Sequence, residues 1–155
     1  MYKYTIKFED FEGNPCTTEA YFNLTKTECV DLNLMYEDDG GLIEHIKKIM
    51  EKREDGTIRQ KPAIDFVKLL IDKSYGIRPK DDPTLFLKED DNGRPLFKRF
   101  KQSAAYDAFV YAIMSGDIPL DEFASKVLPA VSDSQKNEAK AMLRKEGLGE
   151  LVDRV

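Results

Sequence analysis

The chain has 155 residues, of which 41% are hydrophobic and 34% are charged, and its formal net charge is −5. This balance is typical of one globular domain with a core of its own, not of a disordered chain. The negative charge argues against a nucleic acid partner, and the apolar runs are too short for a membrane span or a signal peptide.

The first segment alternates in the manner of a strand. In residues 2–8, YKYTIKF, aromatic and aliphatic side chains take every second position, which is the period of a β-strand with one buried face. Gly13, Asn14 and Pro15 are turn residues, and the β-prone run TTEAYFNL follows them. We therefore predict a hairpin over residues 2–23. A hairpin alone is marginal in water, so it must pack on helices.

Two helices are predicted next. Thr25 and Glu28 have the spacing of a capping box, and the helix they begin runs to about Tyr36. Val30 and Leu34 are placed on its apolar side, with Leu32 and Met35 as further candidates. A second helix follows Gly41. Its apolar residues fall at helical spacing and predict a buried stripe made of Leu42, Ile43, Ile46, Ile49 and Met50.

A third helix is predicted over residues 62–75, with Pro62 in its first turn and Gly76 as its C-terminal cap. Its apolar stripe is wide, which favours a central position. The stretch 77–100 is rich in charged residues, Pro and Gly, and is interpreted as an exposed loop.

The segment SAAYDAFVYAIMSG, residues 103–116, is apolar on almost every side of a predicted helix. A further amphipathic helix ends at Pro129, and the charged segment 131–155 is predicted to be a helical tail with a thin apolar face. The predicted fold class is α+β: an N-terminal β-hairpin packed on a bundle of about five α-helices, in one domain over residues 1–130.

The residues provide no catalytic, cofactor-binding or metal-binding site. His45 has no metal-ligating neighbour at helical spacing and is interpreted as a surface residue, while Cys16 and Cys29 lack zinc-site spacing and are expected to be reduced in a cytosolic protein. An EF-hand alignment on Gly93 would place Lys88 and Arg99 at positions that need oxygen ligands. We therefore predict a protein that is not an enzyme and needs no cofactor.

One patch is suited to an acidic partner. In LFKRFKQ, residues 96–102, Lys98, Arg99 and Lys101 alternate with Phe97 and Phe100. Basic residues mixed with aromatic ones are typical of RNA-binding surfaces, so a small RNA-binding protein remains an alternative. The other interpretation of this patch is an amphipathic approach to the next helix.

Several segments, in this order, resemble a known family. They are FNLTK with Glu28, the helix end KSYG, and a pattern formed by Phe100, Ser103, Ala105, Tyr106 and Phe109. Over residues 2–130 the chain resembles the tail assembly chaperones of long-tailed, siphovirus-type phages that infect Gram-positive bacteria.

The resemblance implies a non-enzymatic assembly factor in the host cytoplasm that is absent from the mature virion. Such proteins keep the helical, aggregation-prone tape measure protein soluble and help recruit tail tube subunits around it. Families of this type often make a longer product by ribosomal frameshifting. The alternative within phage assembly is a structural protein, such as a head–tail joining or tail tube component.

The apolar segment has two interpretations. It is either the centre of a helical core, or it also provides a groove for an amphipathic partner helix or for a second copy of the chain. Under the second interpretation some of its side chains contact the partner. The partner-binding candidates are Tyr106, Phe109, Tyr111, Ile113 and Met114, followed by Leu120, Phe123, Leu69 and Leu70.

Overall fold

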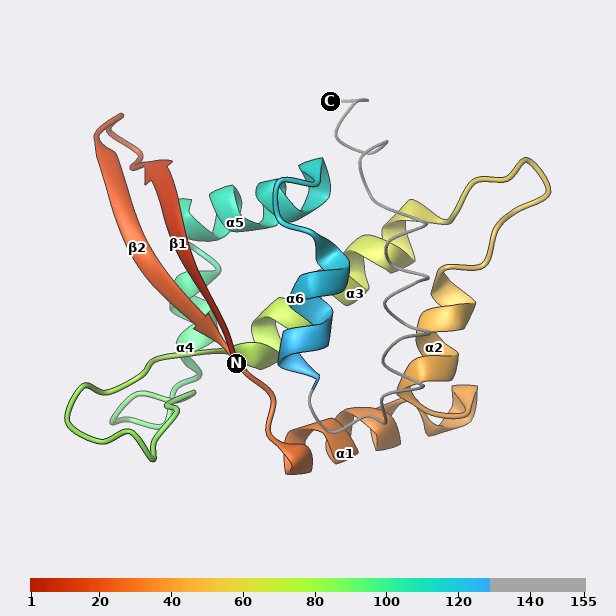
Figure 1. Cartoon of the computed structure of the whole chain (residues 1–155), viewed down its shortest axis with the longest axis horizontal. Coiled ribbons are helices and arrows are strands. Elements are labelled where there is room, and N and C mark those ends of the chain that lie inside the picture. The colour runs from red at the N-terminus through yellow and green to blue at the C-terminus, as the bar shows by residue number, and fades with distance from the viewer. Residues whose placement is uncertain (129–155) are drawn as a thin grey trace.

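The computed structural model describes residues 1–128, and these residues form a small antiparallel sheet packed against helices (Figure 1). The α+β class and the N-terminal hairpin are therefore confirmed. The elements, in chain order, are β1 (Tyr2–Glu9), β2 (Pro15–Phe22), α1 (Lys26–Met35), the 3₁₀ turn η1 (Glu37–Asp39), α2 (Leu42–Ile49), α3 (Gln60–Ser74), β3 (Tyr75–Gly76), α4 (Leu96–Phe100), α5 (Ala104–Ser115) and α6 (Leu120–Val127).

The hairpin pairs β1 with β2 in an unbroken antiparallel register from Tyr2 opposite Phe22 to Glu9 opposite Pro15. Ile6 and Phe22 are buried, whereas Lys3 and its alternating neighbours face solvent. The alternation of apolar and polar residues in β1 therefore correctly predicts which face of the strand is buried. The short strand β3 pairs only with β2, so the strand order is β1-β2-β3 and β1 is an edge strand.

The start of α1 is as predicted, but its buried side is not. The Thr25 hydroxyl accepts from the Glu28 amide, and the Glu28 carboxylate accepts from the Thr25 amide. Of the predicted apolar residues only Leu32 is buried, together with Cys29. The prediction is wrong for Val30 and Leu34, which are each 56% exposed, and for Met35, which is 53% exposed. Apolar residues occur on both sides of this helix, so the contact with α2 decides its rotation.

The link between α1 and α2 is a side-chain cap. Asn33, on α1, accepts a hydrogen bond from the Leu42 amide at 2.8 Å and thereby satisfies a free N–H at the start of α2. This bond requires Asn33 to face α2. The predicted stripe of α2 is confirmed, since Leu42, Ile43, Ile46 and Ile49 are all buried.

The end of α3 corrects a second prediction. Gly76 is not a helix cap: α3 ends at Ser74, whose hydroxyl donates to the Leu70 carbonyl, and Gly76 pairs with Tyr21 in the sheet. A Cβ on Gly76 would collide with the Phe86 ring. The glycine is thus needed for close packing of the loop on the sheet, not for a left-handed turn.

The stretch 77–100, predicted to be an exposed loop with at most one short strand or helical turn, is irregular only as far as residue 95 and ends in the helix α4. The irregular part is also tied to the fold. Isolated bridges join Ile77 to Leu87 and Glu89 to Pro95. Between them, the Lys88 ammonium donates at 2.7 Å to the carbonyls of Asn23 and Lys73 and to the Glu28 carboxylate. One lysine therefore joins the ends of β2 and α3 to the start of α1.

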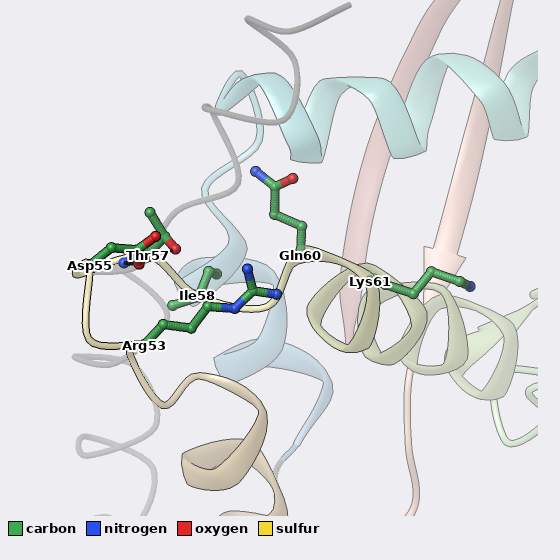
Figure 2. A pocket seen from close by; sticks show the side chains of 6 residues that line it. All are labelled: Arg53, Asp55, Thr57, Ile58, Gln60 and Lys61. Carbon is green, nitrogen blue, oxygen red and sulfur yellow. Dashed lines mark hydrogen bonds between the residues drawn. The ribbon is translucent and has the colours of Figure 1, made fainter.

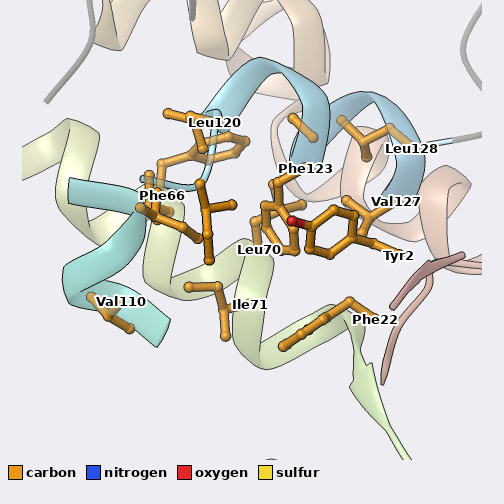
Figure 3. Packing of buried hydrophobic residues seen from close by; sticks show 14 of the residues in the cluster. Tyr2, Phe22, Phe66, Leu70, Ile71, Val110, Leu120, Phe123, Val127 and Leu128 are labelled. Carbon is orange, nitrogen blue, oxygen red and sulfur yellow. The ribbon is translucent and has the colours of Figure 1, made fainter. Parts of the chain in front are cut away.

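The core is built around aromatic rings from the hairpin, α5 and α6. Figure 3 shows the rings of Tyr2 and Phe22 from the hairpin beside Phe123 from α6. Phe22 stacks on Phe109 with ring centroids 4.6 Å apart, and Phe123 meets Phe22 edge-on at 5.4 Å. Aromatic pairs in such geometries add about 0.5–1.5 kcal/mol beyond the burial of their area. The predicted domain boundary at residue 130 and the predicted tail 131–155 lie outside the described residues.

Candidate partner-binding site

The helix α5 holds most of the predicted site residues. Ser103 caps its start by accepting from the Tyr106 amide, and Gly116, with φ of 87°, ends it in the left-handed region that favours glycine. These two caps account for the helix boundaries. Between them the helix contacts β1 on one side and the core on the other.

Most of the predicted partner-binding residues lie in the core. Their side chains are at most 9% exposed, so a partner could reach them only if the fold opened. This buried set comprises Tyr106, Phe109, Ile113, Leu120, Phe123 and Leu70. Their position accounts for the apolar character of the segment by packing alone.

Three predicted residues are accessible. Tyr111 is 48% exposed, and Met114 and Leu69 are half-buried beside the core. An exposed tyrosine offers a large, amphipathic contact surface, and tyrosine is one of the residue types enriched at binding hot spots. Tyr111 is therefore the predicted residue best placed to contact a partner.

Tyr111 lies in a groove between α5 and the edge strand β1. The groove has a volume of about 590 Å³. One wall is formed by Tyr4, Thr5, Ile6 and Lys7 of β1, and the other by Ala108, Tyr111, Ala112 and Asp117 of α5 and the turn after it. The small side chains of Ala108 and Ala112, four residues apart, leave room for a partner to approach the helix.

The lining of the groove is mostly apolar and includes one charge of each sign. Tyr4 packs its ring against Phe109 at 5.8 Å, so the β1 wall is anchored in the core. Lys7 and Asp117 are exposed and carry opposite charges. The Ala112 carbonyl accepts from the Ile118 amide at 3.0 Å, which fixes the turn that carries Asp117.

The β1 wall is not among the predicted site residues, all of which lie on predicted helices. A signal was present, since the alternating run 2–8 marks a strand at the start of the chain. An edge strand presents unpaired N–H and C=O groups, and among the described residues no other strand pairs with the outer side of β1. The groove therefore offers both apolar surface and backbone hydrogen-bonding groups.

A second hollow, of about 340 Å³, lies where the loop before α3 meets the helix start (Figure 2). Arg53, Gln60 and Lys61 line it together with Asp55, Thr57 and Ile58. Asp55 is already bonded to the amide and hydroxyl of Thr57. This hollow has charges of both signs and almost no apolar floor, so it lacks the surface that an amphipathic helix needs.

Two side chains outside the groove, Tyr106 on α5 and Asp72 on α3, have shifted pKa values. Burial raises the pKa of Tyr106 to about 12, and the nearby charge of Asp72 adds to the effect. Burial also raises the pKa of Asp72, although Lys101, 3.5 Å away, works in the opposite direction. Neither residue lines the groove, so these shifts reflect packing and provide no chemistry at the site.

His45 differs from the predicted surface residue. Its ring is half-buried, stacks on Tyr36 at a centroid distance of 3.8 Å and lies 2.7 Å from the Asp39 carboxylate. Cys16 and Cys29 form no disulfide. Within residues 1–128 no group of three His, Cys, Asp or Glu side chains is arranged to hold a metal ion.

The basic patch at residues 96–102 loses one of its aromatic residues to the core. Phe100 is 7% exposed and packs against Tyr75 at 4.0 Å, so it cannot stack on a base. Lys98 and Arg99 remain exposed. This geometry supports the interpretation of the patch as an amphipathic approach to α5.

Among the described helices, none has the length and apolar character needed to cross a membrane.

A family model described as phage tail assembly chaperone matches residues 1–150 of the 155-residue chain. The searches of curated proteins and of solved structures give no match. The resemblance is placed over residues 2–130, whereas the family model matches 20 residues further, to residue 150.

Proposed function

Because this chain belongs to the phage tail assembly chaperone family, we propose that it binds the tape measure protein through the groove between β1 and α5. Bound there, an amphipathic segment of the tape measure protein is kept from aggregating until tail tube subunits assemble around it. The protein acts without catalysis, in the host cytoplasm, and is absent from the mature virion. Long-tailed phages of Gram-positive bacteria are the expected source.

The observation that carries this proposal is the exposure of Tyr111 beside a small-residue stripe. A helix that docks with its apolar face in a groove needs anchors at i, i+3, i+4 spacing and small residues opposite them. Ala108, Tyr111 and Ala112 have this spacing on α5. Lys7 and Asp117 line the groove with opposite charges and would favour one orientation of a charged helix over the other.

The test is co-expression with the tape measure protein, followed by size-exclusion chromatography of the soluble fraction. We expect the two proteins to co-elute, with several copies of this chain on each tape measure chain. Tyr111→Glu places a charge in the groove. We expect it to lower the co-eluting amount roughly tenfold, which corresponds to a loss of about 1.4 kcal/mol of binding free energy.

The matched control is Phe11→Glu, because Phe11 is an exposed aromatic residue, 84% accessible, at the hairpin turn and outside the groove. Equal loss in both variants, or none in either, would reject the groove as the site. A tape measure protein that aggregates even with the wild-type chain and with its longer frameshift product would reject the chaperone function itself.

The structural alternative has its own test. A head–tail joining or tail tube protein is retained in purified virions, whereas an assembly chaperone is not. Mass spectrometry of purified particles that finds this chain at stoichiometric levels would favour the structural role over the one proposed.

A further inference from the structure

The turn of the hairpin presents an aromatic side chain that the fold does not use. Phe11 is 84% exposed, which makes it the most exposed large apolar side chain in the part of the chain that the structure describes. Its ring contacts no other described ring. Large aromatic side chains are the usual anchors of protein interfaces, so the position of this one calls for a partner.

A second turn of the chain shows that the backbone does not require an aromatic residue here. Asp10 accepts hydrogen bonds from the amides two and four residues further on, and its own amide donates to the carbonyl four residues on. Asp90 makes the same three bonds in the turn 90–94. Where the first turn has Phe11, the second has Asp91. The bonds therefore account for the rigidity of the turn but not for its aromatic residue.

Carboxylates surround the exposed ring. Glu9 and Glu12 are exposed, and neither forms an ion pair with a described residue. The hairpin tip, residues 9–13, is thus a rigid apolar anchor between unpaired negative charges. The surface that fits it is an apolar patch beside cations.

The chain carries such a surface at the other end of the hairpin. Ile77 and Leu87 pair across an isolated bridge, and their side chains are 44% and 38% exposed. The Leu96 amide donates to the Lys88 carbonyl at 2.8 Å, which places the start of α4 beside this apolar pair.

The cations of this surface lie on α4. Residues 94–102 contain four cations and no carboxylate. Two of the four, Lys98 and Arg99, are exposed and form no ion pair with a described residue. The carboxylates of Glu89 and Asp91 precede this stretch, so the favourable charge is centred on α4 and not on the turn before it.

We propose that the hairpin tip of one copy of the chain docks on this surface of a second copy. Phe11 then packs against Ile77 and Leu87, and the carboxylates beside it meet the cations of α4. The patch at residues 96–102, which the groove leaves unused, thereby receives an acidic partner.

A chain cannot make this contact with itself. The tip and α4 lie at opposite ends of the hairpin (Figure 1), and the eight residues of β2 between them extend roughly 26 Å. The contact is therefore head-to-tail: each pair of copies keeps one free tip and one free docking surface, so further copies can add. One turn and one short helix form a small interface, so the association is weak and depends on concentration.

Sedimentation velocity of the full-length chain at increasing concentration tests the proposal. We expect the average mass of the wild type to rise above that of the monomer. Phe11→Ser and Arg99→Glu should each weaken this association roughly tenfold or more. The matched controls are Leu34→Ser and Lys26→Glu, which make the same changes at exposed positions of α1 and should associate like the wild type.

A mixture of the two weakened variants gives the decisive result. Phe11→Ser keeps an intact docking surface and Arg99→Glu keeps an intact tip, so together they should form a dimer and nothing larger. A wild type that stays monomeric at every concentration would overturn the proposal, as would a mixture without a dimer. Arg99→Glu that still dimerises alone would overturn it in favour of a contact between two tips.

This inference goes beyond the proposed function, because neither the tip nor its docking surface lines the groove. The two are therefore tested separately. Phe11→Ser should lose self-association and still co-elute with the tape measure protein, whereas Tyr111→Glu should lose co-elution and still self-associate.

Discussion

Tyr106 holds a hydroxyl group in the core with no hydrogen-bond partner among the described residues. A buried polar group without a partner costs the free energy of its lost hydration, about 1–3 kcal/mol. We therefore expect Tyr106→Phe to leave the free energy of unfolding unchanged or to raise it by up to about 1 kcal/mol. Urea denaturation measures this directly.

Tyr111→Phe is the control for this prediction, because the Tyr111 side chain is half exposed and its hydroxyl can bond to water. It should change the unfolding free energy by less than about 0.5 kcal/mol. A loss above about 1 kcal/mol in Tyr106→Phe would mean that a buried water satisfies the hydroxyl.

Asp72 makes stability depend on pH in an unusual direction. Burial raises its pKa, so the folded state holds this proton more tightly than the unfolded state, whose aspartates titrate near about 3.9. Between these two pKa values the contribution of Asp72 to stability falls as the pH rises, and the loss persists at neutral pH.

Asp72→Asn removes this dependence. We expect the variant to be more stable than the wild type at pH 7, and the difference to shrink as the pH falls below the ordinary aspartate pKa. Thermal unfolding of both proteins between pH 3 and pH 7 gives the difference curve. A constant difference across this range would show that Asp72 titrates normally.

At the scale of elements, Lys88 joins three of them. Its ammonium bonds two main-chain carbonyls and the Glu28 carboxylate, which also belongs to the capping box of α1. Burial acts to raise the pKa of Glu28, but the hydrogen bonds from Lys88 and the Thr25 amide lower it overall. Removing the lysine would take its hydrogen bonds from two carbonyls and from one oxygen of the Glu28 carboxylate, which would keep its bond from the Thr25 amide.

We expect Lys88→Met to lower the free energy of unfolding by about 1–3 kcal/mol and to raise the pKa of Glu28. Chemical denaturation and an NMR titration of Glu28 measure the two effects. Lys61→Met is the control, since the pair of Lys61 with Asp65 is exposed and contributes less than about 0.5 kcal/mol. Equal stability of the two variants would show that the three-way contact of Lys88 contributes nothing.

The sequence predicts most of the helices and strands, but it does not predict which side of α1 faces the core. The capping box at Thr25 and the stripe of α2 are local signals, so both are predicted correctly. The rotation of α1 depends on Asn33 reaching α2, a contact between segments that local periodicity does not contain. The role of Gly76 likewise depends on Phe86, ten residues further along the chain.

At the scale of the whole molecule, the candidate groove combines an N-terminal strand with a helix that begins about 100 residues later. The apolar character of α5 predicts that the helix is important, and its aromatic residues are found in the core. It does not predict which face stays open. That depends on β1 being the edge of the sheet, which only the pairing of β3 with β2 determines.

The contact of Tyr2 with Phe123, at 5.2 Å between ring centroids, has a consequence for biosynthesis. Tyr2 leaves the ribosome early, while Phe123 is added about 120 residues later, which takes on the order of ten seconds. Until then the nascent hairpin lacks the ring that closes the core against it. The newborn chain of this tail assembly chaperone therefore passes through an interval in which its own aromatic residues are not yet buried.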